Sequence, residues 1–89
     1  MTKSVFTTKY ERFRLLLIEA RKNAGLTQVE LAQRLSLPQS YVSKYERGER
    51  RLDVIEFLEV AFILNLDVVS FLQQLNNTPN NSAIAHGAK

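Results

Sequence analysis

The sequence has 89 residues, 45% of them hydrophobic, which suffices for one compact core and leaves no room for a second domain. The absence of cysteine excludes a disulfide framework and a thiolate metal site; with no signal-peptide pattern or long apolar run, we expect a cytoplasmic protein without a membrane partner. The net charge of +3 is uneven, because residues 1–52 hold eleven of the twelve Lys and Arg but five of the nine acids, a balance of +6.

The first predicted element is a helix that follows an N-terminal arm, residues 1–7, which has no helical pattern. Thr7 or Thr8 can cap this helix, which runs to about Asn23 before Gly25 ends it. Its apolar stripe comprises Tyr10, Phe13, Leu17, Ala20 and Ala24. Its polar side carries Lys9, Arg12, Arg14, Arg21 and Lys22. For most of these cations, a solvated face is at least as good an interpretation as contact with an anionic partner.

A capping box predicts a second, short helix that begins after Thr27. The Thr27 side chain can accept a hydrogen bond from the Glu30 amide, while the Glu30 carboxylate accepts one from the Thr27 amide. The apolar positions of this helix are Val29, Leu31, Ala32 and Leu35. The pattern stops at residues 36–38, because Pro38 forces the residue before it out of the helical region. We therefore expect a short, sharp turn there.

A third helix is predicted from Pro38 or Gln39 to Arg47, with Gly48 as its C′ stop. At about 100° per residue, Val42 and Tyr45 share an apolar side. The opposite side carries Gln39, Ser40, Ser43, Lys44 and Arg47. This outward face offers hydrogen-bond donors and acceptors without an acid, which suits base edges in the major groove of DNA. Glu46, the only acid of the helix, lies near the edge of the apolar side.

The stretch formed by these two helices resembles the Cro/repressor-type (XRE) helix-turn-helix family of phage repressors and bacterial regulators. The family pattern is met by Gly25, Leu26, Thr27, Gln28, Glu30, Leu31, Ala32, Arg34, Leu35, Tyr41, Ser43, Glu46, Arg47 and Gly48. The resemblance covers about residues 13–72 and implies an all-α, compact five-helix lambda-repressor-like domain that binds double-stranded DNA. Ser36 replaces the usual turn glycine, so a positive φ costs backbone strain there, and Pro38 replaces the usual Ser or Thr cap, which places it at N1.

The resemblance and the polarity of the two helices predict the DNA contacts. Base readout is expected from residues near the start of the recognition helix, about residues 39–47, which reach deepest into the groove: Gln39, Ser40 and Lys44. Backbone contacts are expected from Thr27 and Gln28 at a helix start, from Ser43 and Arg47, and from Gln33 at the margin. Arg50 and Arg51, in the following loop, are either phosphate contacts or solvated cations, and both interpretations stay open.

One ion pair is also implied by the resemblance. The family pairs an Arg four residues before the glycine with the Glu of the ERG motif, and the residues at these positions are Arg21 and Glu46. Such a pair joins the first helix to the recognition helix. We therefore expect both charges to be structural and not DNA ligands.

Two more helices complete the predicted domain. Asp53 caps the fourth, about residues 54–64, whose inward positions are Val54, Phe57, Leu58, Ala61 and Leu64. Asp67 caps the fifth, about residues 68–75, which buries Val68, Phe71 and Leu72. Asn65 stands between them where the family has a glycine, and asparagine tolerates the left-handed conformation required at that position.

These two helices carry more apolar residues than one small core can bury. Ile55, Phe62 and Val69 are apolar where family members are usually polar, and Ile63 adds to them. Exposed apolar area of this kind marks a partner surface. We hypothesise a homodimer through these helices, which places two recognition helices about 34 Å apart on a palindromic operator. The alternatives are cover by the arm or the tail, or a protein-interaction module, such as an antitoxin or accessory subunit, that uses this surface as its main site.

The C-terminal tail, residues 76–89, has little helical or strand signal and is predicted to be disordered. Its His86 is the only histidine and lies far from any acid cluster. Since the sequence has no Ser/His/Asp set and no phosphate-binding glycine loop, we expect neither an enzyme nor a metal or other cofactor. The predicted function is sequence-specific binding of double-stranded DNA by a transcriptional regulator that acts as a repressor.

Overall fold

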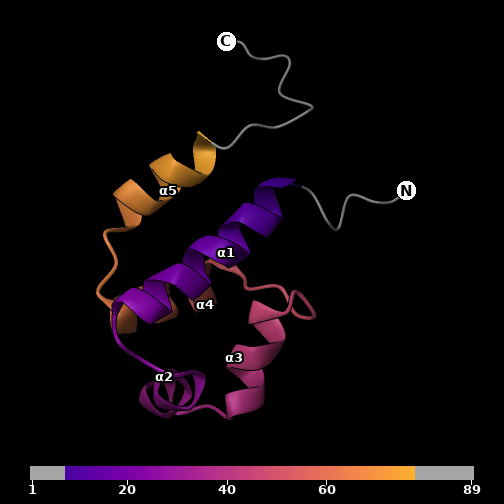
Figure 1. Ribbon diagram of the computed structural model, residues 1–89, viewed down its shortest axis with the longest axis vertical. Helices are drawn as coiled ribbons and strands as arrows, with labels where there is room; N and C mark the ends of the chain where they lie inside the picture. The colour runs from indigo at the N-terminus through magenta and orange to yellow at the C-terminus, as the bar shows by residue number, and fades with distance from the viewer. Residues whose placement is uncertain (1–7, 78–89) are drawn as a thin grey trace.

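The computed structural model describes residues 8–77, and all regular secondary structure in this range is helical (Figure 1). The helices are α1 (Thr8–Asn23), α2 (Gln28–Leu35), α3 (Gln39–Glu46), α4 (Val54–Leu64) and α5 (Val68–Asn76). The predicted five-helix, all-α class is confirmed, with boundaries that agree to within one residue. The arm and the tail beyond Asn77 lie outside the described residues, although α5 runs one residue into the segment predicted to be disordered.

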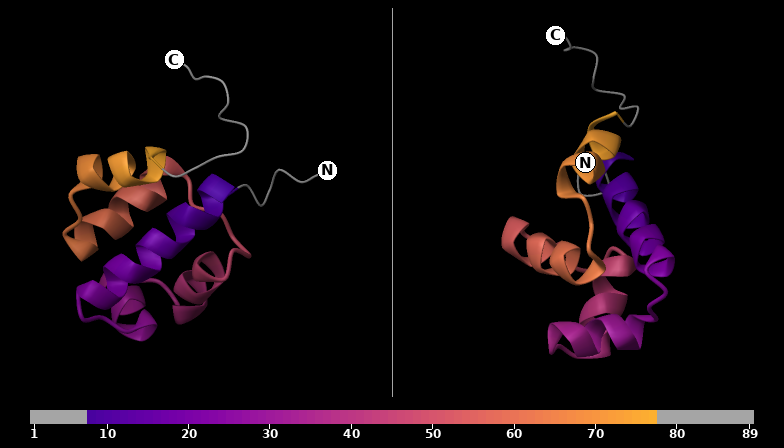
Figure 2. Two further views of the ribbon diagram at one scale, coloured as in Figure 1. Left: turned by 45° about the horizontal axis from the view of Figure 1, so that its top comes forward. Right: turned by 90° about the vertical axis from the view of Figure 1, so that its left-hand side faces the viewer.

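Helix α1 runs across the middle of the molecule, with α5 on one side, α2 and α3 on the other, and α4 behind it (Figures 1 and 2). It packs on α3 and α5, while α2 packs on α3 and α4. Every helix contributes to the core, which consists of Leu16, Leu17, Leu31, Ala32, Val42, Tyr45, Phe57, Val60, Ala61, Leu64 and Phe71. Within residues 8–77, no helix is both long and apolar enough to span a bilayer.

An aromatic cluster joins the first helix to the last two. The ring of Phe13 on α1 lies 5.4 Å from that of Phe57 on α4 and 5.8 Å from that of Phe71 on α5, between ring centroids. The Phe57 and Phe71 rings are 5.2 Å apart. Tilted and edge-on aromatic pairs at such distances add to the stabilisation from burial alone. The cluster therefore holds α4 and α5 against α1.

The turn between α2 and α3 requires a left-handed residue. Ser36 adopts φ 60° and ψ 39°, as expected for a position where the family has glycine, and its amide donates to the carbonyls of Ala32 and Gln33. Pro38 was expected at N1, but it is the N-cap, with φ −68° and ψ 154°, and α3 begins at Gln39. Because proline has no side-chain acceptor, no side-chain hydrogen bond caps α3. Of the two predicted starts of this helix, Pro38 and Gln39, the structure has Gln39.

Several predicted core positions are exposed in the structure: Val29, Val54, Leu58 and Leu72. In contrast, Leu16 and Val60 are buried although the apolar stripes omitted them. The helix α4 has the sequence VIEFLEVAFIL, with apolar residues on nearly all sides. Periodicity cannot orient such a helix, so its rotation is decided by packing against α2 and the Phe13 ring.

Candidate nucleic-acid interface

The N-terminus of α2 is fixed by the predicted capping box. The Glu30 amide donates to the Thr27 hydroxyl oxygen over 3.0 Å, and the Thr27 amide donates to the Glu30 carboxylate over 2.9 Å. Thr27 is exposed, as is Gln33 further along α2. Both therefore lie on the surface, where the predicted DNA contacts need them.

The outward face of α3 is polar, and its charged side chains are basic. Gln39, Ser40, Lys44 and Arg47 are exposed and Ser43 is half-buried, while Val42 and Tyr45 on the opposite side are inaccessible to solvent. The structure thus brings the expected base-reading and backbone-contacting residues of this helix onto one surface. This face can donate to and accept from base edges without repelling phosphates.

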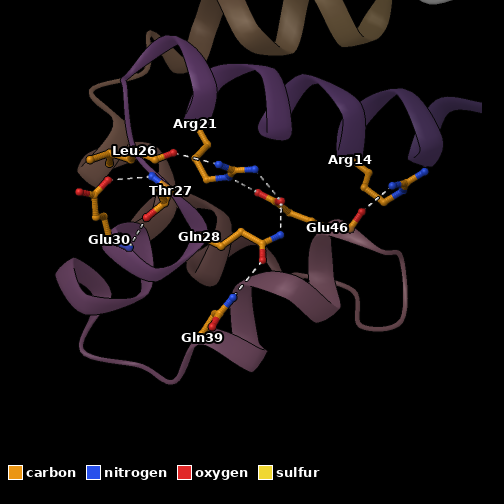
Figure 3. A network of polar contacts seen from close by, with 8 residues as sticks. All are labelled: Arg14, Arg21, Leu26, Thr27, Gln28, Glu30, Gln39 and Glu46. Carbon is orange, nitrogen blue, oxygen red and sulfur yellow. Dashed lines mark hydrogen bonds and ion pairs between the residues drawn. The ribbon is translucent and has the colours of Figure 1, made fainter.

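The one acid of α3 is turned into the protein. Glu46 is 5% exposed, and Arg21 from α1 donates to both carboxylate oxygens, with Nε 2.7 Å from Oε2 and Nη2 3.1 Å from Oε1 (Figure 3). The structure therefore contains the ion pair that the resemblance implies. Arg21 also donates to the Leu26 carbonyl over 2.9 Å, in the connection between α1 and α2. The Glu46 charge is thus neutralised inside the fold and does not add to the polar outward face of α3.

Gln28 links this buried carboxylate to the start of the recognition helix. Its Nε2 donates to Glu46 Oε1 over 2.8 Å, and its Oε1 accepts from Gln39 Nε2 at 3.4 Å (Figure 3). Gln28 was predicted to contact the DNA backbone; in the structure its side chain bridges α2 and α3. Helical periodicity in the sequence does not predict these contacts, because Gln28 lies on α2 whereas Gln39 and Glu46 lie at opposite ends of α3.

The arginines after α3 make contacts within the chain. Arg47 donates to both oxygens of Glu49, at 2.9 and 3.1 Å, and these hydrogen bonds lower the pKa of the Glu49 carboxyl. Arg50 lies 4.6 Å from the Tyr41 ring centroid and donates to Glu56 over 2.7 Å. Arg51 lies 4.1 Å from the ring centroid of Tyr10. Since exposed ion pairs contribute little, Arg47 can exchange its partner for a phosphate at small cost.

Ile55, Phe62 and Val69, which are apolar at positions where the family is usually polar, are exposed. Phe62 is 84% exposed, and Ile55 and Val69 are exposed by about two thirds, at 64% and 66%. Ile63 differs, because it is half-buried against the core and lies at the side of a groove shared with Ile55, Phe62 and the α2 residue Leu35. Val69 lies on another groove, with Lys9 and Leu72. The expected surface is therefore centred on α4, and Val69 stands apart from it.

Tyr45 carries a polar atom that the fold does not use. Its side chain is 1% exposed, and its hydroxyl finds no hydrogen-bond partner among the described residues. Burial raises the pKa of this phenol, and the nearby Glu46 charge acts in the same direction. The ring packs edge-on against Tyr41, with 5.9 Å between centroids. Tyr45 therefore serves as an apolar anchor for α3.

Comparisons with known proteins agree with this geometry. The helix-turn-helix family model matches residues 17–71. An uncharacterised HTH-type transcriptional regulator of Sinorhizobium fredii, y4dJ, is 37% identical over 59 residues, which cover 66% of this chain and 77% of that protein. The solved structure of an XRE-family like protein from Pseudomonas syringae pv. tomato is 50% identical, with a TM-score of 0.74, covering 80% of this chain and 88% of the other.

The family match spans α2 and α3 and agrees with the expectation that the chain is not an enzyme. The structural match extends the likeness to the whole arrangement of helices, so the fold is the lambda-repressor-like one. The chain therefore belongs to the helix-turn-helix family of Cro/C1 (XRE) type, a family of DNA-binding transcriptional regulators.

Proposed function

We propose that this chain binds double-stranded DNA sequence-specifically and acts as a transcriptional repressor, with α3 inserted in the major groove. The observation that carries the proposal is the placement of charge on α3. Lys44 and Arg47 point outward, while Glu46 is buried and paired with Arg21. Phosphates would repel an exposed acid on this face, and the burial of Glu46 leaves only cations among its charged side chains.

The residues divide by the contact that their positions favour. Gln39, Ser40 and Lys44 are proposed to read base edges, since an amide pairs with adenine and an ammonium with guanine. Thr27, Gln28, Ser43 and Arg47 are proposed to position the helix on the phosphates, with Gln33 at the margin. Arg50 is hydrogen-bonded to Glu56 and Arg51 lies over the Tyr10 ring, so we propose a weaker, non-specific role for them at the DNA backbone.

We further propose that the chain binds a palindromic operator as a homodimer. The support is the exposed apolar surface of α4, with Ile55 and Phe62 beside the half-buried Ile63. Arg34 and Glu59 line the same groove, so a two-fold contact can set the cation of one copy against the acid of the other. A symmetric pair of this kind presents two α3 helices to one side of the duplex.

The proposal is tested by selecting bound sequences from a pool of randomised duplexes at two salt concentrations. The expected result is a palindromic site whose half-sites lie about one helical turn, roughly 34 Å, apart. Enrichment of a single half-site would keep DNA readout and remove the homodimer. If no sequence is enriched and binding is weak and salt-sensitive, the proposal fails.

A second candidate function is favoured by one observation, the 84% exposure of Phe62. This candidate is a protein-interaction module that uses the α4 surface for a different protein and contacts DNA weakly or not at all. The same selection separates the two functions, because a module of this kind enriches no sequence at either salt concentration.

A further inference from the structure

The backbone that follows α3 supplies hydrogen-bond donors for only some of the carbonyls at the C-terminal end of this helix. A helix leaves its last four carbonyls without partners inside the helix. Three of these in α3 accept from the following amides: Ser43 from Arg47 at 3.0 Å, Lys44 from Glu49 at 2.9 Å, and Tyr45 from Gly48 at 3.2 Å. The fourth, the carbonyl of Glu46, accepts from Nη1 of Arg14 on α1.

Arg14 is held in place by two further features. Its Nη2 is 2.6 Å from the Glu11 carboxylate one turn earlier on α1, and the Arg14 side chain is 19% exposed. Gly48 adjoins this side chain, and a Cβ there would lie 3.5 Å from Arg14 Cδ and Nε, an ordinary van der Waals contact; glycine is favoured at this position by its φ of +81°. A cation at the C-terminus of a helix also interacts favourably with the helix dipole. The contact is therefore a cap supplied by another helix.

Two arginines on one side of α1 thus hold the same residue of the recognition helix. Arg21 binds the side chain of Glu46 and Arg14 binds its backbone carbonyl (Figure 3). The two contacts are seven residues apart on α1, which is about 10 Å along a helix axis. On α3 both contacts end on Glu46, one on its carboxylate and one on its backbone carbonyl, so they hold this residue from two directions. The last turn of α3, which carries Lys44, is therefore fixed in direction relative to α1.

We infer that Arg14 is a positioning residue for DNA recognition, which fixes the angle at which α3 enters the groove. This inference rests on the proposed function of α3. Arg14 acts through the carbonyl of Glu46 and does not read bases itself. Its loss is expected to lower discrimination between sequences, because discrimination depends on the precise direction of Lys44, Ser40 and Gln39. A mere phosphate contact would lower binding to all sequences alike.

The test compares Arg14→Met with Arg12→Met, a variant that removes the same charge from an exposed position of α1. Binding to the selected duplex and to a scrambled duplex is measured by fluorescence anisotropy. For Arg14→Met we expect the ratio of the two affinities to fall roughly tenfold, in line with a charged hydrogen bond. For Arg12→Met we expect both affinities to fall together and the ratio to stay constant. Equal behaviour of the two variants would overturn the inference.

A second variant serves if Arg14→Met does not fold at the assay temperature. Glu11→Gln leaves Arg14 in place but removes the carboxylate that orients it. Loss of a negative charge by itself strengthens binding to every duplex. We expect the ratio of specific to scrambled affinity to fall nonetheless, by a smaller factor than in Arg14→Met. An unchanged or higher ratio contradicts a positioning role.

A measurement without DNA separates this inference from the proposed function. Hydrogen exchange of the amides of Arg47, Gly48 and Glu49 reports the closing turn of α3 directly. We expect faster exchange of these three amides in Arg14→Met than in Arg12→Met. If the wild-type chain shows no sequence preference but this difference is found, the proposed function fails while the cap stands. If exchange is equal in both variants, the cap itself is refuted.

Discussion

The two halves of the domain are stabilised in different ways and expose different surfaces. From α1 to α3, polar contacts converge on Glu46, which accepts hydrogen bonds from Arg21, Gln28 and Arg14. In the half formed by α4 and α5, the contacts with α1 include the ring pairs that Phe13 makes with Phe57 and Phe71. The first half exposes polar and basic groups on α3, and the second exposes Ile55 and Phe62. The directional polar network suits the proposed role of α3 as a recognition helix, and the exposed apolar side chains suit the proposed dimer contact.

The largest expected effect comes from removing the cation at the centre of the first half. Arg21→Met leaves the buried Glu46 carboxylate without its ion-pair partner, which typically costs about 3–5 kcal/mol. We expect a loss of this size in the free energy of unfolding, measured by chemical denaturation. The control is Arg12→Met, at an exposed position on α1, for which a change within about 0.5 kcal/mol is expected. Equal losses in both variants would show that the network contributes nothing particular to stability.

The next effect concerns association of the second half. Phe62→Glu places a charge in the proposed dimer contact, where burial of a phenylalanine is worth about 2–3 kcal/mol per copy. We expect a monomer in sedimentation and weaker binding to the two-half-site duplex, with unchanged affinity for one half-site. Leu15→Glu, at an apolar position on α1 that is 48% exposed, adds the same charge elsewhere and should leave the dimer intact. A dimer that survives Phe62→Glu would place the contact elsewhere.

A smaller effect is expected on sequence discrimination alone. Lys44→Ala removes a proposed base contact, so it should cost about 1–3 kcal/mol on the selected duplex and relax the preference at one base pair. Stability should not change, because Lys44 is exposed. Lys22→Ala, at an exposed position near the end of α1, is the matched control for charge. Equal losses on selected and scrambled duplexes would refute a reading role for Lys44.

The smallest effect tests the apolar anchor of the recognition helix. Tyr45→Phe removes a buried hydroxyl that lacks a partner among the described residues, so stability near pH 7 should be unchanged or rise by up to about 1 kcal/mol. Burial raises the pKa of Tyr45 in the folded state. Above about pH 10 the unfolded chain therefore loses this proton first, and the stability of the wild type falls. Tyr45→Phe lacks this contribution, so the two unfolding free energies should separate between pH 10 and 11 in denaturation curves. A constant difference would contradict the burial of a neutral phenol.

The comparison of the two halves also shows what a sequence can predict. The capping box of Thr27 and Glu30, the turn at Ser36 and the boundaries of the helices follow from local rules that act within a few residues. The placement of Arg21 against Glu46 came from the family pattern. These features were predicted, and the structure contains them.

Contacts between helices could not be predicted in the same way. Arg14 and Arg21 belong to one run of cations on α1, and composition does not distinguish either from the exposed Arg12. Only the angle at which α3 crosses α1 brings Arg14 to the Glu46 carbonyl. Likewise, Val60 is buried and Leu58 exposed because packing decides the rotation of an apolar helix. The unpredicted part of the site is the part that depends on tertiary geometry.

The claim that α3 reads a DNA sequence is tested most directly by one titration. The wild-type chain is titrated with the selected duplex and with a scrambled duplex of the same composition, at low and physiological salt. Reading of bases predicts affinities that differ by a factor on the order of 10³ or more at physiological salt, since specific sites typically exceed random DNA by that margin. Coincident curves that weaken together as salt is raised would show attraction to phosphates alone, and would contradict the account of α3 as a recognition helix.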